Sequence, residues 1–202
     1  MRLRISGSPV PSVEEEKIGA QLPLFCPERH INGDGTFCLG LPAPSVRDVV
    51  DADHWWGQLG QFLRCQTVAA RTKVWPPAYA LDHGDAGKHH KLAEELAEQA
   101  GVSAEYQAAR LEEAIWITDR RVKLHNQEGD PINGRSPCPR GCRKKARGRM
   151  VRVVRVDCKY RKELTGIAFH EKKRREKLEE FWKDLIGRRA RCCGTMPNCL
   201  LK

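Results

Sequence analysis

Residues 30–40 read HINGDGTFCLG, a short loop that holds three residue types able to do chemistry. Its glycines predict a tight turn that exposes the backbone. Cys38 follows that turn, and His30 and Asn32 are hydrogen-bonding side chains close to it in sequence. A thiol reacts as the thiolate, and acyl transfer through cysteine needs a donor for the tetrahedral oxyanion. The residues alone leave three roles open for Cys38: nucleophile, metal ligand or buried apolar side chain.

The longer stretch at 28–39, ERHINGDGTFCL, resembles the active-site segment of ubiquitin-conjugating enzymes. That family has His-Pro-Asn-Ile, a short turn, glycine, a small residue, an apolar residue, cysteine and leucine. A proline-bearing segment (LPAPS) and a tryptophan-containing helix (DADHWWGQLGQFLRCQ) follow the cysteine here, as they do in the family. The alignment needs no gap, and the matching positions are Ile31, Gly35, Thr36, Phe37, Cys38 and Leu39.

This resemblance implies an α+β fold in which a short antiparallel sheet is packed by helices. It also implies an aminoacyltransferase of the ubiquitin-like protein conjugating class, with no organic cofactor. Cys38 would receive the C-terminus of a ubiquitin-like protein from an activating enzyme and hold it as a thioester. An amine of a protein substrate would then attack, and the enzyme would position the thioester and stabilise the oxyanion.

The chain departs from the family pattern in two ways. His30 stands where the family has its asparagine, so we expect His30 to act as oxyanion donor or as a base near neutral pH. Asn32 and His83 are further candidates for this site, the latter from the loop LDHGDAGKHH at 81–90. Only 29 residues precede His30, which predicts a truncated domain without the family's N-terminal helix. The resemblance therefore favours a divergent bacterial branch, whose relatives use their own activating enzyme and modifier, sometimes in antiviral (phage) defence.

Apolar periodicity and breaker residues predict the elements around this loop. Strands are expected at 2–6, 21–25 and 149–158, and helices at 53–75, 91–100, 103–124 and roughly 168–190. Asp53 is the expected N-cap of the first helix, and its expected apolar face carries Trp56, Leu59, Leu63 and Ala70. The predicted domains are a conjugating-enzyme-like catalytic domain at 1–125, a polar linker at 126–137 and a small basic cysteine-rich module at 138–202.

Positive charge is concentrated in the C-terminal part of the chain. Of a net charge of +10, residues 138–202 hold 21 Lys or Arg against 7 Asp or Glu, and residues 1–137 hold 15 against 19. Such a module indicates an acidic partner, either nucleic acid or an acidic protein surface, or else a solvated basic face. The basic runs lack interleaved aromatic residues, which favours phosphate contacts over base stacking.

Nine cysteines without a signal peptide suggest metal ligands, catalytic thiols or buried side chains more than a disulfide framework. In CPRGC (138–142), proline and glycine form a turn that brings two thiols together, as half of a tetrahedral Zn²⁺ site requires. We expect structural zinc here because a small basic module has few large apolar residues for a core. Unpaired buried cysteines are the alternative. The expected ligands are Cys138, Cys142, Cys193 and Cys199, with Cys158, His170 or Cys192 as substitutes.

No run of about 18 apolar residues is present, so we expect no membrane partner and a cytoplasmic protein. Two other functions stay open on the sequence alone. One is a zinc-dependent nucleic-acid-binding protein whose N-terminal part is a scaffold. The other is an inactive conjugating-enzyme relative that binds a ubiquitin-like protein without chemistry.

Overall fold

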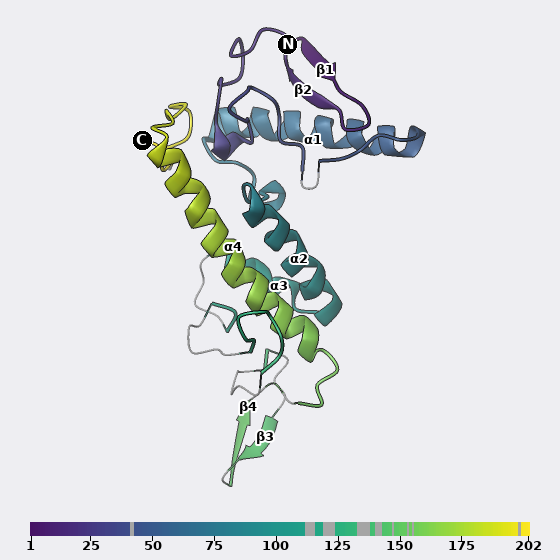
Figure 1. Ribbon diagram of the computed structural model, residues 1–202, viewed down its shortest axis with the longest axis vertical. Coiled ribbons are helices and arrows are strands. Elements are labelled where there is room, and N and C mark those ends of the chain that lie inside the picture. Colours follow the sequence, from purple (N-terminus) through teal and green to yellow (C-terminus); the bar gives the residue numbers. More distant parts are fainter. Residues whose placement is uncertain are drawn as a thin grey trace. The chain divides into compact units, whose positions relative to one another are not determined.

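A computed structural model gives the fold. Within the residues it describes, the chain is α+β as predicted, with four α-helices and two two-stranded antiparallel sheets (Figure 1). The chain divides into two compact units, Met1–His83 with Glu180–Lys202, and Gly84–Glu179. The described residues are 1–40, 43–111, 116–118, 124–132, 138–139, 143–146, 148–152, 154, 156–197 and 199–202.

The first unit begins with a hairpin of β1 (Leu3–Ser6) and β2 (Ser12–Glu15), which confirms the strand predicted at the N-terminus. Alternate residues of β2, Val13 and Glu15, are buried, so one face of the hairpin joins the core. Glu14 forms a further antiparallel bridge to Thr36, which connects β2 to the loop before Cys38. The hairpin thereby supports the segment that the sequence singled out.

The strand predicted at 21–25 is wrong, because this segment forms bends and no ladder. Its backbone donors are bound by a side chain instead. The buried carboxylate of Glu15 accepts hydrogen bonds from the N–H groups of Gln21 and Leu22, each at 3.1 Å. A carboxylate that accepts two backbone donors holds the loop in place and removes the groups that a strand would use for pairing.

Helix α1 (Val49–Thr72) starts four residues earlier than predicted. The Asp48 side chain caps it by accepting the N–H of Asp51 at 2.8 Å, which replaces the cap expected at Asp53. Its buried apolar face is also rotated from the predicted one, because Trp55 is buried whereas Trp56 is 56% exposed. The buried residues of α1 are Trp55, Leu59, Phe62, Cys65, Gln66 and Ala69.

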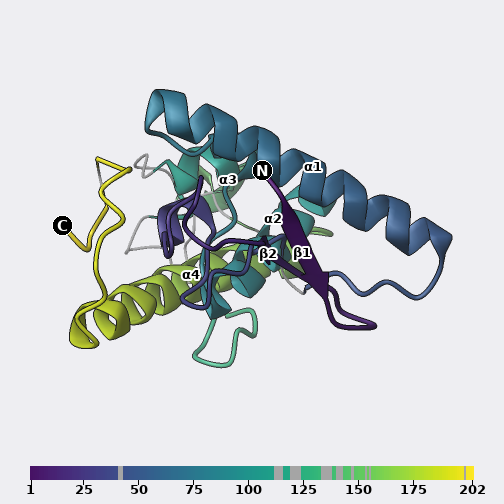
Figure 2. The ribbon, with the colours of Figure 1, turned by 90° about the horizontal axis from the view of Figure 1, so that it is seen from above.

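The core of the first unit joins α1 to the hairpin, the Cys38 loop and the C-terminal segment. Phe37 stacks on Phe62 with ring centroids 4.7 Å apart, and Val13 lies in the same cluster. Figure 2 shows the β1–β2 hairpin beside α1. Met196 and Cys199 are buried in this cluster too. The C-terminal segment after α4 therefore packs on the unit that holds Cys38. The compact units thus differ in extent from the predicted domains, and the linker at 126–137 stays a prediction.

The second unit contains α2 (Asp85–Ala100), α3 (Ser103–Arg110), most of α4 (Arg161–Gly187) and the hairpin of β3 (Arg143–Ala146) and β4 (Arg149–Arg152). The predicted C-terminal stop of α2 is confirmed, because Gly101 caps it in a left-handed conformation. The loop expected at 85–90 is wrong, because these residues are the first turns of α2. Of the helix predicted at 103–124, α3 covers the first eight residues, and 112–115 and 119–123 lie outside the described part.

Small residues allow α2 and α4 to pack closely in the second unit. Ala93 and Ala97 of α2 are fully buried with Leu164 and Ile167 of α4. A Cβ atom placed on Gly166 would lie 2.6 Å from Leu96 Cδ1, so any larger residue here would force the Leu96 side chain to shift. No described helix of the protein is long and apolar enough to cross a membrane.

Candidate active site

A tight turn at the end of a 3₁₀ helix (Pro27–Arg29) places His30. This histidine adopts a left-handed conformation with φ 54°, and its N–H donates to the carbonyl of Pro27 at 2.7 Å. Two backbone hydrogen bonds between Cys26 and Ile31 close the turn at its base. Outside glycine, Asn, Asp and His adopt this conformation most readily. The turn is therefore compatible with histidine and equally with the asparagine that ubiquitin-conjugating enzymes have at this position.

A buried pair fastens this turn to α1. The guanidinium of Arg29 donates from Nε to Gln66 Oε1 at 2.8 Å, and Gln66 Nε2 donates back to the Arg29 carbonyl at 2.7 Å. Both residues are almost completely buried. Because one bond joins the two side chains and the other joins the Gln66 side chain to the Arg29 backbone, they fix both the position and the orientation of the turn on the helix. Sequence reasoning missed this pair, since its members are far apart in the chain.

The loop between His30 and Cys38 is held by its own polar groups. Asp34 Oδ1 accepts the N–H and the hydroxyl of Thr36, and Asn32 Nδ2 donates to the Thr36 hydroxyl oxygen. The N–H of Cys38 then donates to the His30 carbonyl at 2.9 Å, which places these two residues side by side. Asn32, one of the predicted site residues, is exposed and bonded within the loop, away from the pocket described next.

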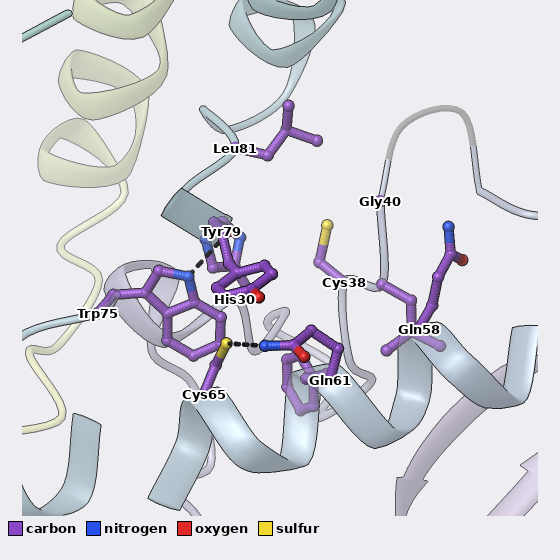
Figure 3. Close-up of a pocket in the computed structure, with 11 residues that line it drawn as sticks. His30, Cys38, Gly40, Gln58, Gln61, Cys65, Trp75, Tyr79 and Leu81 are labelled. Carbon is purple, nitrogen blue, oxygen red and sulfur yellow. Dashed lines mark hydrogen bonds between the residues drawn. The ribbon is translucent and has the colours of Figure 1, made fainter. Parts of the chain in front are cut away.

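A pocket of about 190 Å³ opens beside Cys38 and His30 (Figure 3). One wall comes from α1, which contributes side chains one turn apart, and the opposite wall comes from Trp75 and the segment that follows it. Trp75 is fixed by a hydrogen bond from its Nε1 to the Tyr79 carbonyl at 3.1 Å. The pocket is lined by His30, Cys38, Leu39, Gly40, Gln58, Gln61, Phe62, Cys65, Trp75, Tyr79 and Leu81.

Two cysteines line this pocket, and their surroundings differ. Cys38 is half-buried, and its sulfur accepts the backbone N–H of Gly40. Burial raises the pKa of the Cys38 thiol, and the Gly40 N–H partly offsets that rise. Cys65 is buried, and Gln61 Nε2 donates to its sulfur at 3.4 Å. Cys38 is thus the more accessible thiol, and it already has a backbone donor beside the position where a carbonyl carbon would be attacked.

His30 is a buried neutral imidazole. Its ring lies 4.8 Å from Trp75 and 5.1 Å from His83, measured between centroids. Burial, followed by repulsion from His83, lowers the pKa of His30 to about 3, although Asp82 acts in the opposite direction. A group with this pKa takes up a proton poorly at neutral pH. The geometry therefore favours His30 as an N–H donor over the role of base.

His83 lies behind His30 and packs among aromatic rings of the same unit. It stacks on Phe181 at 5.0 Å and meets the edge of Trp182 at 5.7 Å. Burial lowers the pKa of His83 to about 4, with Asp82 again opposing. The pocket lining in the described part of the chain does not include His83, so this predicted residue is placed to support His30 from behind.

Gln58 and Gln61 also line the pocket, although the sequence did not single them out. Gln58 Nε2 lies 3.0 Å from His54 Nε2, and its Oε1 is buried without a partner among the described residues. An unsatisfied buried acceptor costs free energy, so it is a natural place for a ligand N–H. The signal in the sequence was their spacing, since Gln58, Gln61 and Cys65 follow one face of α1.

The predicted zinc ligands are distributed over both units. Cys138 is buried in the core cluster of the second unit, where Cys158 packs against the same cluster. Cys142 lies outside the described residues, and Cys193 and Cys199 belong to the first unit. Among the described residues, no group of three or more His, Cys, Asp or Glu could hold a metal ion. His170, a predicted substitute, bonds instead to His89, with the two Nδ1 atoms 2.9 Å apart.

The raised pKa of Cys38 predicts its reactivity with an alkylating agent. We expect the rate of iodoacetamide labelling of Cys38 to rise about tenfold per pH unit between pH 6 and 8, because only the thiolate reacts. The rate should still be rising above pH 9, since the pKa is shifted upward. Mass spectrometry of the tryptic peptide 30–47, which holds no other cysteine, measures this rate. His30→Asn should leave the slope unchanged, and a plateau below pH 8 would contradict the raised pKa.

Family comparisons cover nearly the whole chain. A family model described as a prokaryotic E2 domain matches residues 1–77, including the turn, Cys38 and α1. A second model, described as a cysteine-rich domain C-terminal to the E2 domain, matches residues 82–201. No curated protein and no solved structure matches the chain. The cysteine-rich match follows the E2 match along the chain, as its description states.

Proposed function

The chain belongs to the family of prokaryotic E2 domains followed by a cysteine-rich C-terminal domain, and on this premise we propose that Cys38 carries a ubiquitin-like protein as a thioester. E2 domains are those of ubiquitin-conjugating enzymes, so the chain has a conjugation-related function. Our proposal goes further than this general function. It includes the thioester on Cys38, its transfer to a substrate amine, and the protein partners. The observation that carries it is the half-buried Cys38 thiol, held by the Gly40 N–H at the edge of a pocket.

In the first step, the Cys38 thiolate attacks the thioester carbonyl that joins the modifier to its activating enzyme. The carbonyl oxygen becomes an oxyanion, and the thiolate of the activating enzyme then leaves. Two donors lie next to this position, the backbone N–H of Gly40 and the imidazole of His30. Preorganised donors of this kind typically contribute 10²–10³ in rate, because they need no reorganisation as charge develops.

In the second step, a substrate amine attacks the Cys38 thioester. The amide bond forms, the bond to the Cys38 sulfur breaks, and the proton of the amine passes to the departing sulfur, which restores the Cys38 thiol. His30 does not take this proton in our proposal, because its pKa lies near 3. The unpartnered Gln58 Oε1 fits this site as an acceptor for an N–H of the modifier's C-terminal residues or of the incoming amine. The chain's own residues thus orient the two reactants and stabilise charge.

A charging assay tests this function. The protein is mixed with a cognate activating enzyme, its ubiquitin-like protein and ATP, and the products are separated with and without reductant. We expect an adduct that a thiol reductant removes. If no adduct forms with partners that are active on another conjugating enzyme, the transferase proposal fails. Binding of the ubiquitin-like protein without an adduct would instead support an inactive relative.

A structural zinc is a further part of the proposal, since the matched cysteine-rich domain is compatible with zinc. In the described residues, Cys138 and Cys158 meet in one core cluster, which favours Cys158 as a companion of the Cys138–Cys142 turn. Zinc would supply folding energy to this unit. We expect metal analysis of the full-length protein to find about one zinc that Cys138→Ser removes. Metal-free folded protein would refute the proposal.

The partners follow from the family at a general level. An E2 domain works with protein partners such as an activating enzyme and a ubiquitin-like protein, and these are the partners that we propose here. A role in antiviral defence and nucleic-acid binding through the basic residues 138–202 stay predictions from the sequence. Salt-dependent retention of the protein on DNA or RNA measures the latter.

A further inference from the structure

Two cysteines that the proposed chemistry does not use lie against each other in the first unit. Cys26 precedes the 3₁₀ helix of the active-site turn, and Cys193 lies in the segment after α4. Their sulfur atoms are 2.8 Å apart, although 167 positions separate them in the chain. This separation exceeds the length of a disulfide bond by about 0.8 Å, so a small movement would bring them to bonding distance.

The same distance argues against a metal at this pair. Two sulfur ligands of a tetrahedral zinc ion, each about 2.3 Å from the metal, lie about 3.8 Å from each other. The sulfurs of Cys26 and Cys193 are closer than that, and no third ligand joins them in a metal-binding group among the described residues. The other two cysteines of the C-terminal segment, Cys192 and Cys199, form a separate hydrogen-bonded pair.

We propose that Cys26 and Cys193 are a site of reversible oxidation, at which a low-molecular-weight disulfide converts the two thiols into a disulfide bond. This bond covalently fastens the C-terminal segment to the base of the active-site turn. The proposal concerns the thiol pair itself and does not rest on the conjugation activity of Cys38.

The two thiols differ in their access to solvent. Cys26 is fully buried, whereas Cys193 is only partly buried. The Cys193 sulfur also lies 3.1 Å from the Thr195 hydroxyl, within hydrogen-bonding distance. Cys193 is therefore the thiol that a low-molecular-weight disulfide reaches first, and its thiolate is the attacking group.

The Cys193 thiolate attacks one sulfur of glutathione disulfide, which forms a mixed disulfide and releases one glutathione thiolate. That thiolate takes the proton of Cys26, and the resulting Cys26 thiolate attacks the Cys193 sulfur. A second glutathione thiolate leaves. Two protein thiols are oxidised, and one glutathione disulfide is reduced to two molecules of glutathione.

Oxidation at Cys26 acts on the turn that carries His30. The backbone of Cys26 accepts from Arg29 and Ile31, and its own N–H donates to the Ile31 carbonyl. These bonds close the turn beside which Cys38 lies. A disulfide there would also restrict the unfolded chain over a very long loop, which stabilises the native state. We expect the melting temperature of the first unit to rise by about 5–15 °C on oxidation.

Peptide mapping tests this site in the full-length protein. The protein is incubated with glutathione disulfide, remaining thiols are blocked with iodoacetamide, and the product is digested with trypsin without reductant. Cys26 is the single cysteine of tryptic peptide 18–29, Cys38 lies in the separate peptide 30–47, and the C-terminal cysteines lie in 192–202. We expect mass spectrometry to detect peptide 18–29 joined to peptide 192–202, with a mass two hydrogens below their sum.

Matched variants assign the linkage and keep the test decisive if one of them folds poorly. Cys193→Ser, at a partly buried position, should abolish the linked peptide, and the neighbouring Cys192→Ser should keep it. Melting temperatures under reductant check that both variants are folded. Loss of the link in Cys192→Ser but not in Cys193→Ser overturns the assignment. No linked peptide, or about one zinc per chain that Cys193→Ser removes, overturns the proposal itself.

Discussion

Cys38→Ala is expected to lower the reductant-sensitive adduct with the ubiquitin-like protein by at least about 100-fold, to below detection. The thiol is the group that forms the new bond, and neither His30 nor Gln58 can replace it, since both lack a nucleophile of comparable strength. The matched control is Cys65→Ala, which removes the other cysteine of the same pocket. Cys65 is buried and bonded to Gln61, so its loss should leave the adduct at near wild-type levels.

Cys38→Ser separates the chemistry from the packing of this position. Serine keeps the size of the side chain and the hydrogen bond from Gly40, but its hydroxyl is a far weaker nucleophile. Any adduct that it forms is an oxygen ester, which a thiol reductant removes much more slowly than a thioester. A gel run with and without reductant distinguishes the two bonds. A reductant-sensitive adduct in Cys38→Ala, or its loss in folded Cys65→Ala, would assign the nucleophile to another cysteine.

The proposed nucleophile was singled out by the sequence, but its neighbours were not. The resemblance aligned Gly35, Phe37 and Cys38 without a gap, and the structure places Phe37 in the core directly before Cys38. The burial of His30 depends on Trp75 and His83, which reach it only in the folded chain. Burial keeps His30 neutral, and local sequence does not reveal this burial. The sequence alone was therefore compatible with both roles of His30, oxyanion donor and base.

Helix α1 shows how a pattern can predict an element and miss its orientation. Spaced apolar residues correctly predicted a helix here, but it ends at Thr72, three residues before the predicted end at the prolines 76 and 77. Trp55 and Trp56 are adjacent, and their side chains point about 100° apart around the helix, so periodicity alone fits two faces nearly equally well. Packing of the hairpin and of Phe37 against the helix selects the face with Trp55.

The cysteines illustrate the limit of spacing arguments. Spacing joins residues that are close in the chain, such as Cys138 and Cys142, and it suggested one module for all the later cysteines. In the structure, Cys193 meets Cys26, a residue that no motif in the sequence connects with it. Contacts of this kind depend on where α4 returns the chain, and local patterns carry no information on that.

The Arg29–Gln66 pair is expected to have the largest effect on the stability of the first unit. Gln66→Leu leaves the buried guanidinium of Arg29 without its side-chain acceptor and the Arg29 carbonyl without its donor. We expect the free energy of unfolding to fall by about 2–4 kcal/mol, because buried polar groups are costly when a partner is removed. Gln61→Leu is the control on the same helix. Its bonds to Arg64 are exposed, so it should cost less than about 1 kcal/mol.

A double-mutant cycle shows whether the two residues act on each other. Arg29→Met alone leaves Gln66 Oε1 without its donor, whereas the double variant removes both polar side chains and leaves two apolar ones in contact. The double variant should therefore be more stable than the sum of the single losses predicts, by at least about 1 kcal/mol. Tryptophan fluorescence during urea unfolding reports mainly on the first unit, which holds Trp55, Trp56, Trp75 and Trp182. Two results would mean that other contacts hold the turn of His30 on α1. One is that the losses in free energy of unfolding of the single variants add up exactly in the double variant. The other is that Gln66→Leu lowers the free energy of unfolding no more than Gln61→Leu does.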